Sequence, residues 1–100
     1  MPHPFSTRGT AIVALDGNTT WTADDILEST IMGGYNPGAA TRDIALPDPA
    51  DCEGITVFAA NAGSSGGTVA FTDDGGTVAA VGDGKGVSLF SDGNRWYGVS

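Results

Sequence analysis

The sequence has little positive charge and no long apolar run. Four Lys and Arg residues stand against twelve Asp and Glu residues, which gives a net charge of −8 at pH 7. Binding to nucleic acid or to an anionic membrane requires cations that neutralise phosphates, so we expect neither partner. The longest apolar stretches, residues 12–15 and 55–60, are far shorter than the ~20 residues that span a bilayer.

Histidine and cysteine each occur once. Nucleophilic catalysis by a Ser-His-Asp or Cys-His arrangement needs an imidazole held rigidly against the nucleophile. His3 stands between two prolines near the start of the chain, so we expect a protein that is not an enzyme. Cys52 has no partner for an intrachain disulfide or a cysteine-based zinc site, and we expect a free thiol whose replacement changes stability little.

Two pairs of adjacent acidic residues could in principle act as the paired carboxylates that cleave glycosides. Asp24–Asp25 and Asp73–Asp74 are neighbours in sequence, and neighbours in a strand or helix point to different faces, so we interpret them as solvated turn residues. Asp73, Asp74 and Asp83 lie in neighbouring turns that could converge on a calcium ion, but their spacing matches no known calcium loop. We expect no cofactor and no metal, and leave the calcium question open.

Glycine is abundant, with 16 residues, while only 16% of the chain is charged. One hundred residues suffice for one domain with one core. Two prolines and no periodicity in residues 1–9 predict an extended N-terminal arm, and residues 10–100 form a single β domain. Turn signals recur at the ~8–12 residue spacing of a small antiparallel β-sandwich or barrel.

The predicted elements are mostly strands. Strands are expected at residues 10–15, 29–32, 41–46, 54–60, 68–71, 77–81, 87–91 and 95–100. Thr22 can cap the one short helix, of at most two turns, and residues 33–38 should break regular structure. Residues 47–53 should form a tight corner or a single helical turn.

The second half of the chain should be a meander. Glycine-rich loops between residues 61 and 86 resemble a repeat, but their strands share no fixed side-chain period, so we expect no solenoid. In the strongest strand, Ile55, Val57 and Ala59 fall on one face.

Trp96 and Tyr97 are consecutive, so if both lie in one strand, one ring enters the core and the other faces outward. The outward ring could contact a sugar or a neighbouring subunit, and the interface is favoured because Tyr and Trp are enriched at interfaces. A domain of this size buries only about 60–65% of its unfolded surface and would benefit from subunit contacts. We therefore place Trp96 and Tyr97 at the interface of a homo-oligomer, a trimer by expectation.

Three segments together resemble known proteins. Residues 21–31 (WTADDILESTI), the corner at 46–50 (LPDPA) and the ending at 86–100 (GVSLFSDGNRWYGVS) resemble small β-rich structural modules of tailed bacteriophage virions, the proteins of head decoration and tail fibres. This resemblance implies a non-enzymatic protein that is made in the host cytoplasm. It would bind the major capsid protein at junctions between capsomers and stabilise the capsid exterior.

Decoration proteins of this kind have an N-terminal arm that reaches the shell. Residues 2–8 could be such an arm, with Phe5 as anchor, Arg8 as ionic contact, and Pro2 and Pro4 stiffening the segment. The alternative is a tail-fibre or receptor-binding module that holds cell-surface glycans with exposed aromatic rings and acidic loops. A carbohydrate-binding module outside any virion is a third possibility.

Overall fold

A computed structural model describes residues 12–28, 31–74 and 76–99. For Glu28, Ile31 and Met32 it describes the backbone alone. The predicted arm, with its four proposed contact residues, lies outside these ranges. That prediction therefore stays untested.

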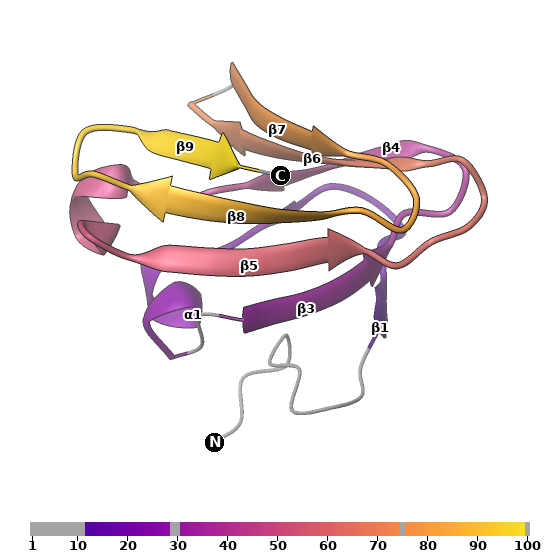
Figure 1. Cartoon of the computed structure of the whole chain (residues 1–100), viewed down its shortest axis with the longest axis horizontal. Helices are drawn as coiled ribbons and strands as arrows, with labels where there is room; N and C mark the ends of the chain where they lie inside the picture. The colour runs from indigo at the N-terminus through magenta and orange to yellow at the C-terminus, as the bar shows by residue number, and fades with distance from the viewer. Residues whose placement is uncertain (1–11, 29–30, 75, 100) are drawn as a thin grey trace.

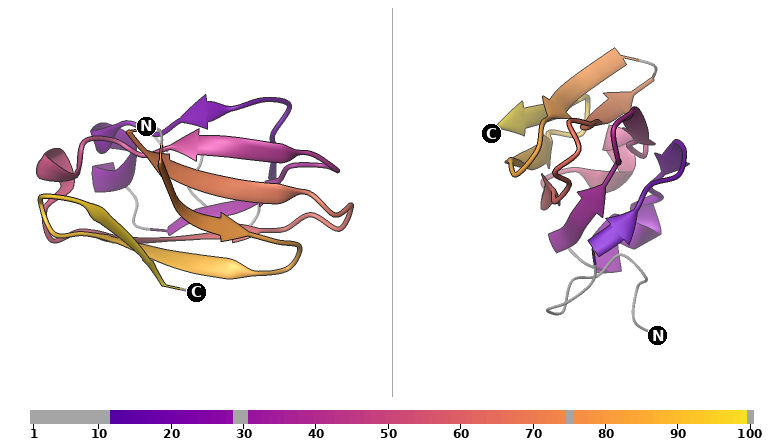
Figure 2. Two further views of the ribbon diagram at one scale, coloured as in Figure 1. Left: turned by 90° about the horizontal axis from the view of Figure 1, so that it is seen from above. Right: turned by 90° about the vertical axis from the view of Figure 1, so that its right-hand side faces the viewer.

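Over the described residues, the chain forms two β-sheets packed face to face, with one short α-helix and one 3-10 turn (Figure 1). The five-stranded sheet has the order β1 (Ile12–Ala14), β3 (Ile31–Asn36), β5 (Thr56–Asn61), β8 (Gly86–Ser91) and β9 (Trp96–Val99). The four-stranded sheet has the order β2 (Thr19–Thr20), β4 (Thr41–Ala45), β6 (Thr68–Asp73) and β7 (Gly76–Val81). Views from above and from the side show the two layers (Figure 2). The prediction of a small all-β sandwich is confirmed.

Strand direction differs from the prediction of antiparallel pairing throughout. The first six strands alternate between the sheets, so each pairs in parallel with the strand two places later: β1 with β3, β2 with β4, β3 with β5 and β4 with β6. These strands form three stacked coils, an arrangement we did not expect. Side-chain alternation has a period of two in both parallel and antiparallel strands, so it does not reveal strand direction.

The second half of the chain is only partly a meander. β6 and β7 form a hairpin, as do β8 and β9. The connections from β5 to β6 and from β7 to β8 instead cross between the sheets, and β8 returns antiparallel to β5. The sheets are therefore mixed, parallel in the coils and antiparallel at the end.

Glycines do not break β3, contrary to the prediction for residues 33–38. The strand runs through Gly33 and Gly34, with an irregularity in its pairing to β5 between Ile31 and Gly33. A Cβ atom on Gly34 would lie 3.1 Å from the Cβ of Ala62, so glycine allows a close approach that a larger residue would widen. The strand continues to Tyr35, which is fully buried.

Three aromatic rings form the centre of the core. The ring of Trp21 lies 5.9 Å from that of Tyr35 and 5.3 Å from that of Phe71, both in tilted geometry. All three side chains are fully buried. Each comes from a different coil, so the cluster joins the coils as well as the two sheets.

The helix α1 (Ala23–Glu28) begins as the sequence predicts. The Asp25 N–H donates to Thr22 Oγ1 over 3.2 Å, and the Thr22 N–H donates to Asp25 Oδ2 over 2.9 Å. This reciprocal cap satisfies two of the amides that a helix start leaves unpaired. Among the described residues, no helix approaches the length or apolar character needed to cross a bilayer.

The corner before β5 is the single 3-10 turn η1 (Pro49–Cys52), as expected. Cys52 is a free thiol, which confirms one prediction, but it is 1% exposed and belongs to the core. Burial, together with the charges of Asp51 and Asp48, raises the pKa of the thiol. The polar residues around Cys52 in the sequence gave no sign of this burial.

Because Cys52 packs in the core, we expect Cys52→Ser to lower the free energy of unfolding by about 1–3 kcal/mol, the cost of burying a hydroxyl without a partner. Urea denaturation followed by tryptophan fluorescence measures the change. Cys52→Ala, which adds no polar group, is the control and should cost less. Equal stability of the Ser variant and the wild type would show that the site tolerates a polar atom.

Asn61 is the buried polar side chain that connects the coils to the antiparallel end. Its Nδ2 donates to the carbonyls of Gly67 (3.1 Å) and Val81 (2.9 Å), and its Oδ1 accepts from the Gly63 N–H (2.8 Å). The side chain is 1% exposed. All its polar atoms are therefore bonded, as burial demands.

We expect Asn61→Ala to destabilise the fold by about 2–4 kcal/mol, because it leaves two carbonyls and one amide buried without partners. Chemical denaturation monitored by circular dichroism measures this loss. Asn94→Ala, at an exposed position in the β8–β9 turn, should change stability by less than about 0.5 kcal/mol. If the two variants lost the same stability, the Asn61 network would not hold the fold as described.

Candidate functional site

The strands of the five-stranded sheet are uncharged, although 16% of the whole chain is charged. Within the described ranges these five strands contain no Asp, Glu, Lys or Arg. We call the outward-facing part of β5, β8 and β9 the aromatic face. It comprises Thr56, Phe58, Ala60, Gly86, Ser88, Phe90, Tyr97 and Val99.

Three exposed rings dominate the aromatic face. Phe58 is 44% exposed, Phe90 38% and Tyr97 41%. The rings of Phe90 and Tyr97 are cross-strand neighbours, with centroids 6.5 Å apart and planes at 29°. Such a near-parallel pair presents apolar area to solvent on a rigid support.

Phe58 lies across the neighbouring strand. A Cβ atom on Gly86 would come within 2.7 Å of the Phe58 ring, so the ring occupies the space that a larger residue would need. A larger residue at this position of β8 would therefore displace the Phe58 ring, which now covers Gly86.

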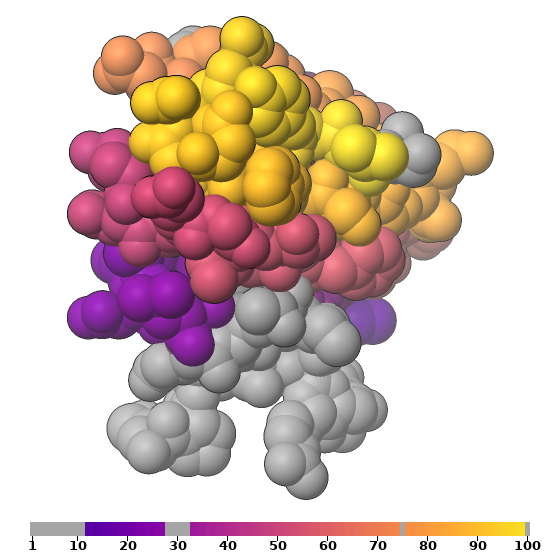
Figure 3. Space-filling view, turned by 60° about the vertical axis from the view of Figure 1, so that its left-hand side comes forward, coloured from indigo at the N-terminus to yellow at the C-terminus, as the bar shows by residue number. Residues whose placement is uncertain are grey.

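Small and hydroxyl-bearing residues alternate with the rings. In the strand register, Thr56 lies opposite Phe90 and Ser88 lies opposite both Phe58 and Val99. Side chains of β5, β8 and β9 adjoin one another in the space-filling view, in pink, orange and yellow (Figure 3). The result is a mainly apolar surface that contains the hydroxyl groups of Thr56 and Ser88, with that of Tyr97 at its rim.

One acid and one base stand at the rim of the aromatic face, in the β8–β9 turn. Asp92 Oδ1 accepts from the N–H groups of Asn94 (2.8 Å) and Arg95 (2.9 Å), and Tyr97 Oη donates to Asp92 Oδ2 (3.0 Å). The Arg95 guanidinium lies 5.2 Å from the centre of the Tyr97 ring. This turn therefore fixes the Tyr97 ring in place.

The same contacts shift two pKa values. The backbone amides of Asn94 and Arg95, aided by the Tyr97 hydroxyl, hold the pKa of Asp92 below its usual range. The hydrogen bond to Asp92 raises the pKa of Tyr97 above its usual value. The carboxylate thus stays ionised and the phenol protonated at neutral pH.

Trp96 is buried and Tyr97 is exposed, as the alternation of side chains along a strand predicts. Trp96 is 3% exposed, packs in the core, and donates from Nε1 to the carbonyl of Pro47 over 2.9 Å. Tyr97 faces outward. Of the two residues assigned to a subunit interface, Tyr97 alone is accessible to a second chain, and its role there remains a prediction.

Comparison with protein-family models, curated proteins and solved structures found no match to this chain. Its function must therefore be inferred from the chemistry of its surfaces.

The acidic turns do not converge as the calcium hypothesis required. Asp73 and Asp74 line a groove with Asp48 and Asn94, and burial, with the charges of Asp74 and Asp48, raises the pKa of Asp73. Asp83 instead lies in the β7–β8 turn, where Oδ2 accepts from the Gly66 N–H over 2.9 Å. No group of three metal-ligating side chains occurs in the described ranges.

Two other grooves are lined by small residues. One of about 480 Å³ lies between β7 and β8, with Asp83 and Lys85 at its edge, and one of about 430 Å³ lies near Arg42. Neither groove is lined by an aromatic side chain.

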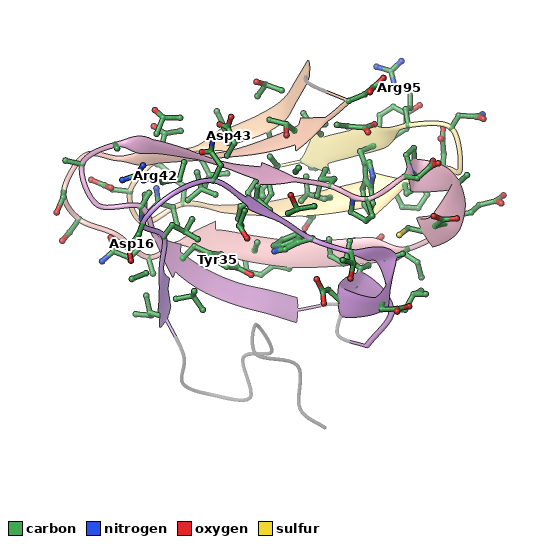
Figure 4. The ribbon with its side chains drawn as sticks, turned by 180° about the vertical axis from the view of Figure 1, so that it is seen from behind. Asp16, Tyr35, Arg42, Asp43 and Arg95 are labelled. Atoms are coloured by element: carbon green, nitrogen blue, oxygen red, sulfur yellow. The ribbon has the colours of Figure 1, made fainter. Side chains whose placement is uncertain are left out.

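The labelled charged residues do not form one cluster. In the view from behind, Asp16 and Arg42 lie at one end of the molecule and Arg95 lies at the other (Figure 4).

Phe58 and Phe90 were missed by the sequence analysis. The alternation of side chains along the two strands could have predicted both exposed rings. Because Val57 and Ala59 face the core, Phe58 must face outward, and the same alternation in β8 turns Phe90 outward. Small substrates bind in concave pockets, whereas an exposed apolar surface is typical of a contact with a macromolecule. The aromatic face is the candidate functional site.

The bond between Tyr97 and Asp92 generates a prediction. We expect Asp92→Asn to lower the pKa of Tyr97 toward the ordinary value, because the ionised acceptor that holds the phenolic proton is lost. Titration of tyrosinate absorbance measures the shift, and Tyr97→Phe identifies which step belongs to this residue rather than to buried Tyr35. An unchanged Tyr97 pKa in Asp92→Asn would contradict the assigned cause.

Proposed function

We propose that this chain is a non-enzymatic structural protein that acts by docking, with its aromatic face buried against protein in a larger assembly. The observation that carries this proposal is the combination of three exposed rings and no charge on one sheet of a chain with a net charge of −8. Contiguous apolar patches of this kind mark interaction sites on soluble domains.

The composition of the face matches that of protein interfaces. Their buried centres are depleted of charge and enriched in Tyr and Phe, with Arg and other polar groups at the rim. Phe58, Phe90 and Tyr97 form such a centre, and Arg95 with Asp92 stands at one edge. Rings on a sheet lose little side-chain entropy when they dock, which favours binding.

We propose a tailed-phage virion as the assembly, with the protein decorating and stabilising the capsid exterior. This part rests on the resemblance of three sequence segments to virion modules and on the docking surface. Residues 2–8 are the proposed contact with the major capsid protein, and Tyr97 is the proposed subunit contact. A homo-oligomer placed between capsomers is the corresponding arrangement.

Glycan binding on a tail fibre is the second candidate. Exposed rings could stack on sugars, with Asp92 and Arg95 at the edge as hydrogen-bonding groups. Asp92 is already bonded to two backbone amides and to Tyr97, which reduces its capacity to bind a sugar. Protein docking is therefore the preferred function.

Binding to purified, decoration-free expanded heads tests the proposal. We expect saturable binding of the intact protein, and loss of at least tenfold in affinity when residues 2–8 are deleted. Thr41→Ser, an exposed change on the other sheet, is the control and should bind as the wild type does. Absence of head binding together with saturable binding to host glycans would favour the tail-fibre function instead.

A further inference from the structure

We propose that the aromatic face is covered by the same face of a second copy of this chain. This inference rests on the proposed function and names the partner of that surface. The argument depends on the relief of the face, the signs of the charges at its rim and the area that it can bury.

The relief of the face is self-complementary. Large residues (Phe58, Phe90) lie opposite smaller ones (Ser88, Thr56) in the register of β5 and β8. When a sheet face packs on a second sheet at about 10 Å, side chains interdigitate, and large residues need small residues opposite them. A face that carries both kinds in alternation can supply both sides of such a contact.

The charges at the rim are also self-complementary. Asp92 and Arg95 stand in the same turn, one anion beside one cation. Two copies related by a twofold axis can bring the Arg95 guanidinium of each near the Asp92 carboxylate of the other, so that the opposite charges attract without a further hydrogen bond to Asp92. A surface that bears one charge of each sign therefore fits its own copy.

Net charge restricts where two copies can meet. Two chains of charge −8 repel each other, and salt at physiological strength screens charges beyond about 8 Å. The five strands of this sheet contain no acidic residue, whereas β4 and β6 of the other sheet contain Asp43 and Asp73. The aromatic face is the sheet surface where a second copy meets the least repulsion.

The area predicts a weak association. Rings exposed to about 40% contribute on the order of 60–100 Å² each, and with Val99, 66% exposed, the face offers roughly 300–400 Å². A standard interface buries about 800 Å² on each partner. Self-association should therefore depend on concentration, and a large shell would favour it by holding copies close together.

Analytical ultracentrifugation of the full chain, from roughly 5 to 500 µM, tests this inference. The mean mass should rise above 10.0 kDa as concentration increases. Thr56→Glu, which places a charge on the aromatic face, should raise the dissociation constant at least tenfold. Thr41→Glu is the matched control: each threonine is exposed and begins a strand, but Thr41 lies on the other sheet, so this variant should associate as the wild type does.

Phe58→Ser is a second variant that adds no charge and should weaken association in the same way, with circular dichroism showing that each variant is folded. A mass of 10.0 kDa at every concentration, or equal effects of Thr56→Glu and Thr41→Glu, would overturn the inference. Association that resists both face variants but is lost in Val78→Lys would also overturn it, since β7 edge pairing would then be the contact. Head binding by a chain that stays monomeric would contradict this inference and leave the proposed function standing. Self-association without head binding would support this inference and contradict the proposed function.

Discussion

The buried amide of Asn61 is the constraint on which the architecture depends. Through β6 the chain stacks in parallel coils, and from β7 onward it turns back to close both sheets with antiparallel strands. Asn61 ends β5 and bonds to Gly63 and Gly67 in the β5–β6 connection and to Val81 at the end of β7. Its backbone N–H and C=O also bond to Lys85 and Gly84 in the turn before β8. One residue therefore fixes the relative positions of β5, β6, β7 and β8.

The aromatic face follows from this junction. Because β8 returns beside β5 rather than beside β7, Phe58 and Phe90 come to the same surface, and β9 adds Tyr97 to it. In the meander expected from the sequence, β5 and β8 would be separated by two strands and the rings would be dispersed. The topology thus creates the aromatic face, and the β8–β9 turn orients one of its rings.

Charge is distributed so that this surface stays neutral. The acidic residues that the structure describes lie in loops, in α1 and η1 and on the four-stranded sheet, and Asp25, Asp48 and Asp92 also bond to backbone amides. The carboxylates thus contribute to local structure, while the neutral sheet remains free for apolar contact. This separation is a property of the fold that the net charge alone does not reveal.

The sequence by itself determined the properties that depend on near neighbours: the all-β class, the Thr22 cap, the 3-10 turn after Asp48 and the alternation that buries Trp96 and exposes Tyr97. These follow from side-chain period and turn chemistry, which act over a few residues. Only the tertiary structure decided the parallel coils, the burial of Cys52, the continuation of β3 through two glycines and the meeting of Phe58 with Phe90. Each of these depends on which distant segments become neighbours, and pairing between distant strands is selected by the packing of the whole core rather than by any local pattern.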